Sequence, residues 1–130
     1  MVSEEDTLMQ DPRLTVGLNH FNASDWYEAH DVFEELWHET QGLMRPVLQG
    51  VLQIAVAHLH LERDNQNGAM ILLGEGIGRL SQVDINVLGL DLQTLKNLAQ
   101  VRLQRLQCGL SLEGCPPLRI DRISDVPSVH

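Results

Sequence analysis

Apolar residues recur every three or four positions in five stretches of the chain. These stretches cover about 12–22, 26–40, 46–62, 67–80 and 92–106. This spacing places the apolar side chains on one face of an α-helix, and no stretch shows the alternation of period two that is typical of a strand. The connections are mostly short, so consecutive helices should be antiparallel. The sequence therefore predicts an all-α fold, a compact bundle of about five helices.

Several helix ends are marked by residues that cap helices. Asp11 precedes Pro12, the arrangement expected of an N-cap followed by the first helical residue. Asp25 and Glu28 have the spacing of a capping box, and Asp91 is placed to cap the last helix. These residues predict where three of the five helices begin.

The fourth stretch contains three glycines, Gly74, Gly76 and Gly78. Each lowers helix propensity by roughly 1 kcal/mol. Glycines two positions apart cannot all lie on one side of a helix. We therefore expect close packing to explain one or two of them, and a frayed or kinked helix end to explain the rest.

The length of 130 residues suits one domain that spans 1–130. Its core should lie within about 11–107, followed by an irregular tail at 108–130 in which glycine and proline recur. The tail contains Cys115, and Cys108 stands at its start; their spacing matches no common zinc pattern. Two free thiols are expected in a reducing compartment, with a disulfide or a metal pair as alternatives.

Charge narrows the classes of partner. The formal net charge is -9, and the sequence shows no run of lysine and arginine. A phosphate backbone or an anionic membrane would be repelled, so we expect no nucleic acid and no membrane as partners. No apolar run approaches the roughly 20 residues that span a bilayer, and the acidic first residues are unlike a signal peptide. We expect a soluble cytoplasmic protein, and the sequence leaves a homo-oligomer open.

The stretch YEAHDVFEELWHE at 27–39 carries the first candidate chemistry. At 100° per residue, His30, Glu34, Trp37 and His38 fall within about a quarter of the helix circumference. Glu28 lies on the opposite flank, where a solvated charged surface is the expected role. The polar positions border the apolar stripe of the same helix, so they should be partly buried.

A second polar stripe, formed by Gln49, Gln53 and His60, follows the stretch at 46–62. An unpaired buried polar group costs about 1–3 kcal/mol, so polar residues beside a core-forming stripe should have partners. If the two helices pack as an antiparallel hairpin, His30 and Glu34 face this second stripe. We therefore predict one partly buried polar cluster, in which His30 and His60 approach each other or share partners.

Three roles are open to this cluster. It can be a hydrogen-bond network that ties the helices together. It can be a metal site, for which His30, Glu34, His38 and His60 are the candidate ligands to a divalent ion. It can also be a metal-free pocket for a ligand or for acid–base chemistry.

Other residues of reactive or aromatic type have a weaker context. His58 lies on the Val51 side of its helix, away from His60, and is expected at a helix boundary or in contact with a partner. The aromatic residues, which all fall within seventeen positions, should mainly anchor the core. Trp26 and Tyr27, at a helix start, are also placed to wall a pocket or a contact surface.

The runs FNASDWYEAHDVFEELWHE and LQGVLQIAVAHLHLERDNQNGAMILLGEGIGRL, followed by GLDLQTL, resemble the small helical family known as domain of unknown function 309. The resemblance covers roughly 13–95. Its motif is F-x-x-x-x-(Y/W)-(Y/F)-E-A-H-E-x-x-E-x-x-W, then L-Q-G-x-I-Q-x-A-x-x-x-x-H. Asp31 stands where a glutamate is usual. The positions that match are Glu28, His30, Glu34, Trp37, Gln49, Gln53, His60 and Gly68.

The resemblance implies a compact multihelical fold and no established activity. It gives less weight to His38 and His58, which match no position of the motif, and so it weakens the metal hypothesis. The favoured hypothesis is a domain that binds a protein partner or a small molecule. The alternative is a metal-dependent hydrolase that uses His30, Glu34 and His60.

Overall fold

The computed structural model describes residues 2–84 and 86–125, and within these ranges the fold is all-α with no strand. The predicted fold class is confirmed. The α-helices are α1 (Glu4–Gln10), α2 (Pro12–Asn22), α3 (Trp26–Glu39), α4 (Arg45–Glu62), α5 (Gln66–Leu80) and α6 (Leu92–Gln107), with 3₁₀ turns η1 (Val87–Gly89) and η2 (Ile123–Asp125). The five predicted helices correspond to α2 to α6, and α1 is an element that the sequence pattern did not predict.

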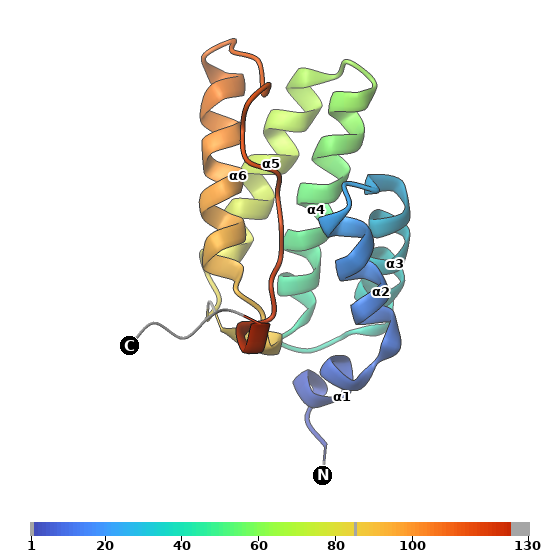
Figure 1. Ribbon diagram of the computed structural model, residues 1–130. Coiled ribbons are helices and arrows are strands. Elements are labelled where there is room, and N and C mark those ends of the chain that lie inside the picture. The colour runs from blue at the N-terminus through green and yellow to red at the C-terminus, as the bar shows by residue number, and fades with distance from the viewer. Residues whose placement is uncertain (1, 85, 126–130) are drawn as a thin grey trace, which may run out of the picture.

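From α2 onward, each α-helix packs against the next one along the chain. α4 and α5 lie in the middle of the bundle, with α2 and α3 on one side and α6 at the other edge (Figure 1). α1 lies below α2, near the end of the bundle where α4 begins (Figure 1). In the described part of the chain, no helix is both long enough and apolar enough to cross a membrane.

Two of the three predicted helix caps are present. The Asp11 carboxylate accepts the N–H of Arg13 at 2.9 Å, next to Pro12. The Asp91 carboxylate accepts the N–H of Thr94 at 3.1 Å at the start of α6. Each carboxylate satisfies a backbone donor that has no partner within the helix, so α2 and α6 begin where the sequence indicated.

The capping box predicted for Asp25 and Glu28 is wrong. Asp25 stands at the N-cap position of α3, but its side chain makes no capping hydrogen bond. Its carboxylate lies 3.2 Å from Nδ1 of His20, and its backbone N–H donates to the His20 carbonyl at 2.9 Å. The tight turn between α2 and α3 has thus given the carboxylate another partner, and Glu28 is exposed.

Close packing explains one glycine of α5. A Cβ on Gly76 would lie 2.8 Å from the carbonyl oxygen of Gly50, on the facing side of α4, and 2.9 Å from Ile54 Cγ1. By contrast, a Cβ on Gly78 would meet nothing within 4 Å, and one on Gly74 would lie 3.9 Å from the nearest atom. α5 continues without interruption to Leu80, so the expected fraying or kink is not observed.

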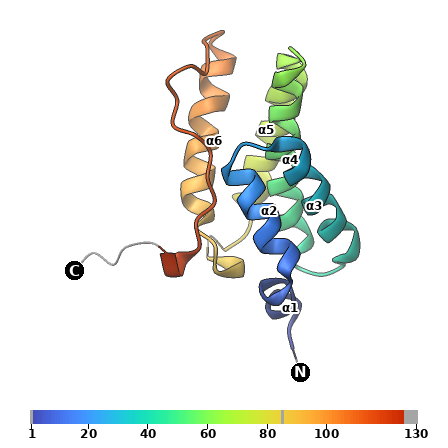
Figure 2. The ribbon, with the colours of Figure 1, turned by 45° about the vertical axis from the view of Figure 1, so that its right-hand side comes forward.

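The tail after α6 is irregular, as predicted, but it belongs to the core. Leu118 and Ile120 are buried with exposed fractions of 0% and 1%, and Leu8 of α1 is buried as well. The predicted core range of about 11–107 is therefore too narrow. The tail returns along the bundle between α6 and α2 as an extended segment (Figures 1 and 2).

Hydrogen bonds hold this segment in place. The side-chain amide of Asn22 donates to the Ile120 carbonyl at 2.9 Å and accepts the Ile120 N–H at 2.7 Å. The Asp91 N–H donates to the Asp121 carbonyl at 2.8 Å, and Arg122 donates to Thr15 Oγ1 at 2.7 Å. The segment therefore joins α2 to the start of α6, two elements far apart in the sequence.

Candidate functional site

The exposed side of α3 carries a row of three ionisable side chains. Glu34 Oε2 lies 3.0 Å from His30 Nε2, and Glu34 Oε1 lies 3.6 Å from His38 Nε2. His30 Nδ1 lies 3.1 Å from the Tyr27 carbonyl, one turn earlier. Residues four apart lie one turn apart on a helix, so the sequence alone determines this row. The predicted proximity of His30, Glu34 and His38 is confirmed.

Trp37 is held by the end of α3 and the start of α4. The guanidinium of Arg45 lies 4.1 Å from the centre of a Trp37 ring and donates to the carbonyls of Trp37 and Thr40 at 3.0 and 3.1 Å. Trp37 Nε1 is buried and has no hydrogen-bond partner among the described residues. The contact between Trp37 and Arg45 thus holds the end of α3 against the start of α4, which gives Trp37 a structural role.

The second predicted stripe does not face α3. Gln53 donates to Glu75 Oε2 at 2.9 Å and accepts from Arg79 Nε at 3.0 Å, and both partners lie on α5. His60 Nδ1 lies 3.0 Å from Asn65 Nδ2 at the α4–α5 turn. Gln49 is half-buried and makes no side-chain hydrogen bond within the described ranges. Gln53 thus joins α4 to α5, and His60 holds the turn between them.

The predicted single cluster across the α3–α4 hairpin is not observed as a network, because no hydrogen bond or ion pair joins the two stripes in the described residues. His30 has its partners on α3, whereas His60 has its partner in the turn after α4, and the described residues show no shared partner. The cause is the orientation of α4 about its axis, because α4 packs against α3 on one side and α5 on another. Helical spacing places residues on a common face but does not say which neighbour that face meets.

The metal hypothesis is not supported by this geometry. Within residues 2–84 and 86–125, no group of three or more histidine, cysteine, aspartate or glutamate side chains is arranged to hold a metal ion. The candidate set was His30, Glu34, His38 and His60, and the hydrogen-bond partner of His60 is Asn65 in the α4–α5 turn. A catalytic metal site needs about three protein ligands and an open position.

Replacement of Glu34 by leucine is expected to change the free energy of unfolding by less than about 1 kcal/mol. Its side chain is 44% exposed and its partners are two histidines on the same helix, so the ion pairs are surface interactions of small net value. Urea denaturation at pH 7 measures the change. A loss above about 2 kcal/mol would instead indicate the buried network that the sequence suggested.

His58 is buried, and its position was predicted incorrectly. It is 4% exposed, and its ring lies 4.5 Å from that of Trp26. Nδ1–H donates to the Ile54 carbonyl at 2.8 Å, so Nε2 is free to accept from Arg102 Nη1 at 3.1 Å. The sequence pattern could have predicted this burial, because His58 lies on the same side of α4 as the apolar residue Val51.

Burial controls the ionisation of His58. The pKa of His58 is lowered to about 4, mainly by desolvation; the hydrogen bond to Ile54 opposes this shift, and the Arg102 charge adds to it. Burial also lowers the pKa of Arg102, and the nearby Cys115 acts in the opposite direction. Arg102 donates to the Pro116 carbonyl at 3.0 Å as well. His58 and Arg102 therefore connect α4, α6 and the tail.

Both cysteines near the tail are free thiols, and Cys108 is exposed.

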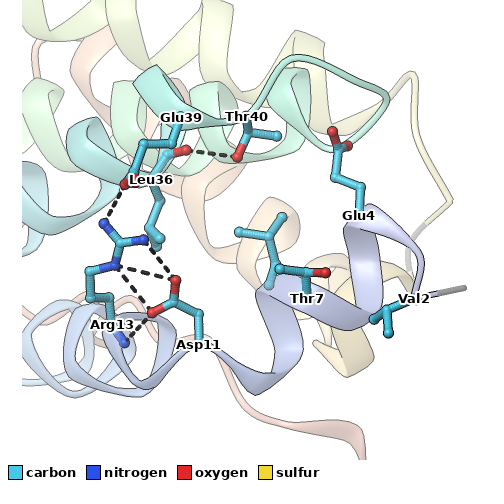
Figure 3. A pocket seen from close by; sticks show the side chains of 9 residues that line it. Val2, Glu4, Thr7, Asp11, Arg13, Leu36, Glu39 and Thr40 are labelled. Atoms are coloured by element: carbon cyan, nitrogen blue, oxygen red, sulfur yellow. Dashed lines mark hydrogen bonds and ion pairs between the residues drawn. The ribbon is translucent and has the colours of Figure 1, made fainter.

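A pocket of about 360 Å³ lies beside the C-terminal end of α3, between that helix and α1. Figure 3 shows Arg13 on one wall, where it pairs with Asp11 at 2.8 Å and also with Glu39. The Arg13 hydrogen bonds hold the pKa of Asp11 below its usual value, although burial opposes this shift. The hydrogen bonds of Arg13 to Asp11, Glu39 and Glu35, in decreasing order of effect, raise the pKa of Arg13. The charges on this wall are thus largely paired within the protein.

Residues 14–72 match the family model described as domain of unknown function (DUF309). This segment, somewhat less than half of the chain, is similar to the DUF309 family. The match confirms the resemblance noted from the sequence over α2, α3, α4 and the first part of α5. The DUF309 segment includes the His30–Glu34–His38 row and His58, whereas Arg102 and the tail lie outside it. A search of the curated proteins finds no match to the chain.

Proposed function

We propose that this chain is a protein-binding domain and that its contact surface is the outer side of α3. This surface, called the α3 face below, consists of Tyr27, His30, Asp31, Glu34 and His38. At 100° per residue, these positions fall within about 100° of the helix circumference. All five lie in the segment that matches DUF309.

The observation that carries the proposal is the exposure of Tyr27. Phe21, Phe33 and Trp26 are buried, and Trp37 packs with Arg45, whereas Tyr27 is 58% exposed. Its ring lies 5.4 Å from that of His30, on a surface that also offers carboxylates and imidazoles. Exposed tyrosines contribute strongly to protein–protein contacts because they combine a large apolar area with one polar group.

The shape of the α3 face favours a protein partner over a small molecule. Small-molecule sites are concave, whereas α3 lies at the margin of the bundle (Figure 2). The pocket shown in Figure 3 lies beside Leu36 and Thr40, on another side of α3.

The charge of the α3 face favours a basic partner. Asp31 and Glu34 contribute two carboxylates, and the whole chain carries a formal net charge of -9. A complementary basic surface would be attracted at long range, which raises association rates and selects against acidic partners. The same charge supports the expectation that nucleic acid is not the ligand.

Site-specific crosslinking tests this proposal. A photoreactive phenylalanine analogue at position 27 is expected to give a discrete crosslinked protein in extracts of the source cells. The same analogue at position 71 is the control, because Ile71 is exposed to a similar extent, 61%, but lies on α5. We expect at least a fivefold higher adduct yield at position 27.

A charge reversal supplies the second measurement. Asp31→Arg should reduce the adduct at position 27 at least fivefold, because it reverses the charge of the α3 face. Glu62→Arg makes the same change in net charge at an exposed position of α4 and should leave the adduct unchanged. Equal adduct yields at positions 27 and 71, or equal effects of the two charge reversals, would contradict the proposal.

A further inference from the structure

α1 is held against the rest of the chain by few side chains. It has seven residues, of which only Leu8 is buried, and the Met9 side chain lies against Gly89. Helices shorter than about 12 residues are not stable alone in water, so α1 depends on these contacts for its order. Segments with so little buried surface open locally more readily than the core does. The surface beneath α1 is therefore accessible by local opening.

The principal polar contact of α1 is a carboxylate held by backbone donors. Glu4 Oε2 accepts the N–H of Gly42 and Glu4 Oε1 accepts the N–H of Met44, each at 2.8 Å. Met44 is the N-cap residue of α4, a helix of eighteen residues. The helix dipole and the free N–H groups at this end favour an anion. The protein thus binds a carboxylate of its own at the start of α4.

The glycine at position 42 is fitted to this carboxylate. A Cβ on Gly42 would lie 2.5 Å from Glu4 Oε2, closer than real Cβ contacts allow. Any other residue would therefore push the carboxylate away from its two donors.

α1 does not fill the space in which it lies. The pocket of about 360 Å³ in Figure 3 separates α1 from Leu36 and Thr40. A second pocket, of about 390 Å³, lies between α1 and the α3–α4 connection, where Glu5 and Leu43 are among the lining residues. Leu43 is 86% exposed. The surface beneath α1 thus has apolar area that α1 leaves uncovered.

We propose that this surface, called the α1 groove below, binds a helical segment of a partner protein that presents one glutamate, and that α1 occupies it as an intramolecular substitute. The segment would carry a glutamate for the N–H groups of Gly42 and Met44. A leucine one turn later would fill the position that Leu8 fills now. A further apolar side chain would cover Leu43. The α1 groove is separate from the α3 face, so the two proposals are tested independently.

The unfilled pockets favour a partner over a second copy of this chain. An α1 helix exchanged from a second copy would bring the same side chains and leave the same two pockets and the same exposed Leu43. A partner segment with an apolar residue in place of Glu5 would bury additional apolar surface, which stabilises binding. Displacement of α1 then follows from competition for one site.

A peptide of residues 2–11, labelled with fluorescein and cross-linked between positions 6 and 10 to hold the helix, is the probe. Fluorescence anisotropy measures its binding to the full chain. The variant Glu4→Gln/Leu8→Ala, which loosens α1, should bind the probe at least tenfold tighter than the unmodified chain. Asp6→Asn/Gln10→Ala is the matched control, because both side chains are exposed, and should bind as the unmodified chain does.

Variants of the probe and the groove test the recognised chemistry. Glu4→Gln or Leu8→Ala in the probe should weaken its binding to the loosened chain at least tenfold, whereas Glu5→Leu should strengthen it at least threefold. Gly42→Ala in the loosened chain should weaken binding at least tenfold, because the added Cβ excludes the carboxylate. Thermal unfolding monitored by circular dichroism shows whether each chain is folded. If the double variant Glu4→Gln/Leu8→Ala does not fold, the single variant Glu4→Gln replaces it as the loosened chain.

Three outcomes would overturn the inference. One is a loosened, folded chain that does not bind the probe. Another is binding whose affinity is unchanged by both Glu4→Gln and Leu8→Ala in the probe. The third is an unmodified chain that forms dimers which the probe dissociates, with no gain from Glu5→Leu, because that result assigns the groove to a second copy.

Discussion

Gly76→Ala is expected to lower the free energy of unfolding by about 1–3 kcal/mol, the range for overpacking a close contact. The new methyl group would lie 2.8 Å from the Gly50 carbonyl oxygen, and backbone cannot rotate away as a flexible side chain can. α4 and α5 would have to separate, which would disturb the contacts of Ile54 as well. Urea denaturation with an unchanged m-value would measure the loss.

Gly78→Ala is the matched control for this substitution. It lies two residues along the same helix, and its added methyl group would meet nothing within 4 Å. Alanine has a higher helix propensity than glycine, so Gly78→Ala should raise the free energy of unfolding by about 0.5–1 kcal/mol. If both substitutions raised the free energy of unfolding, helix propensity rather than the Gly50–Gly76 contact would decide the outcome.

His58 is expected to make the protein less stable as the pH falls from 6.5 to 4. In the folded protein its pKa is about 4, compared with 6.5 for an unperturbed histidine. The unfolded chain therefore takes up a proton near pH 6.5, while the folded chain resists until about pH 4. Acidification through this window favours unfolding, by about 3 kcal/mol for a difference of this size, and pH above 6.5 has no effect through this group.

The comparison variant for this prediction is His58→Gln. Glutamine does not titrate, so the variant should lose the part of the pH dependence that His58 supplies, although it is less stable at pH 7 because the stacking on Trp26 is lost. Denaturant midpoints of both chains at half-unit steps from pH 4 to pH 7 measure the two slopes. Parallel slopes would show that other carboxylates and histidines account for all of the acid sensitivity.

The helices that could be predicted from the sequence are those whose information is local. The caps at Asp11 and Asp91 and the apolar periodicity located α2 and α6, and periodicity located α3, α4 and α5. α1 was missed because its segment has one buried apolar residue and no apolar stripe. Its carboxylate contact depends on residues 38 and 40 positions away, which no local pattern reports.

The candidate site divides in the same way. The row of His30, Glu34 and His38 follows from spacing within one helix, so the sequence was sufficient to predict it. The partners of Gln53 depend on which side of α4 meets α5, and the burial of His58 depends on Trp26 and Arg102, which come from two other helices. These contacts are between different helices, so the local pattern of a single sequence does not predict them.

The tail has a consequence for the order in which this protein can fold during its synthesis. Asn22 and Ile120 are 98 residues apart, and Leu118 and Ile120 complete the core. At roughly 5–20 residues per second, a ribosome takes about 5–20 s to make the chain between them. During that interval α2 lacks the segment that joins it to α6, and apolar surface stays open to chaperones or to aggregation. The bundle is thus closed by late-made residues instead of growing outward from the first helices to emerge.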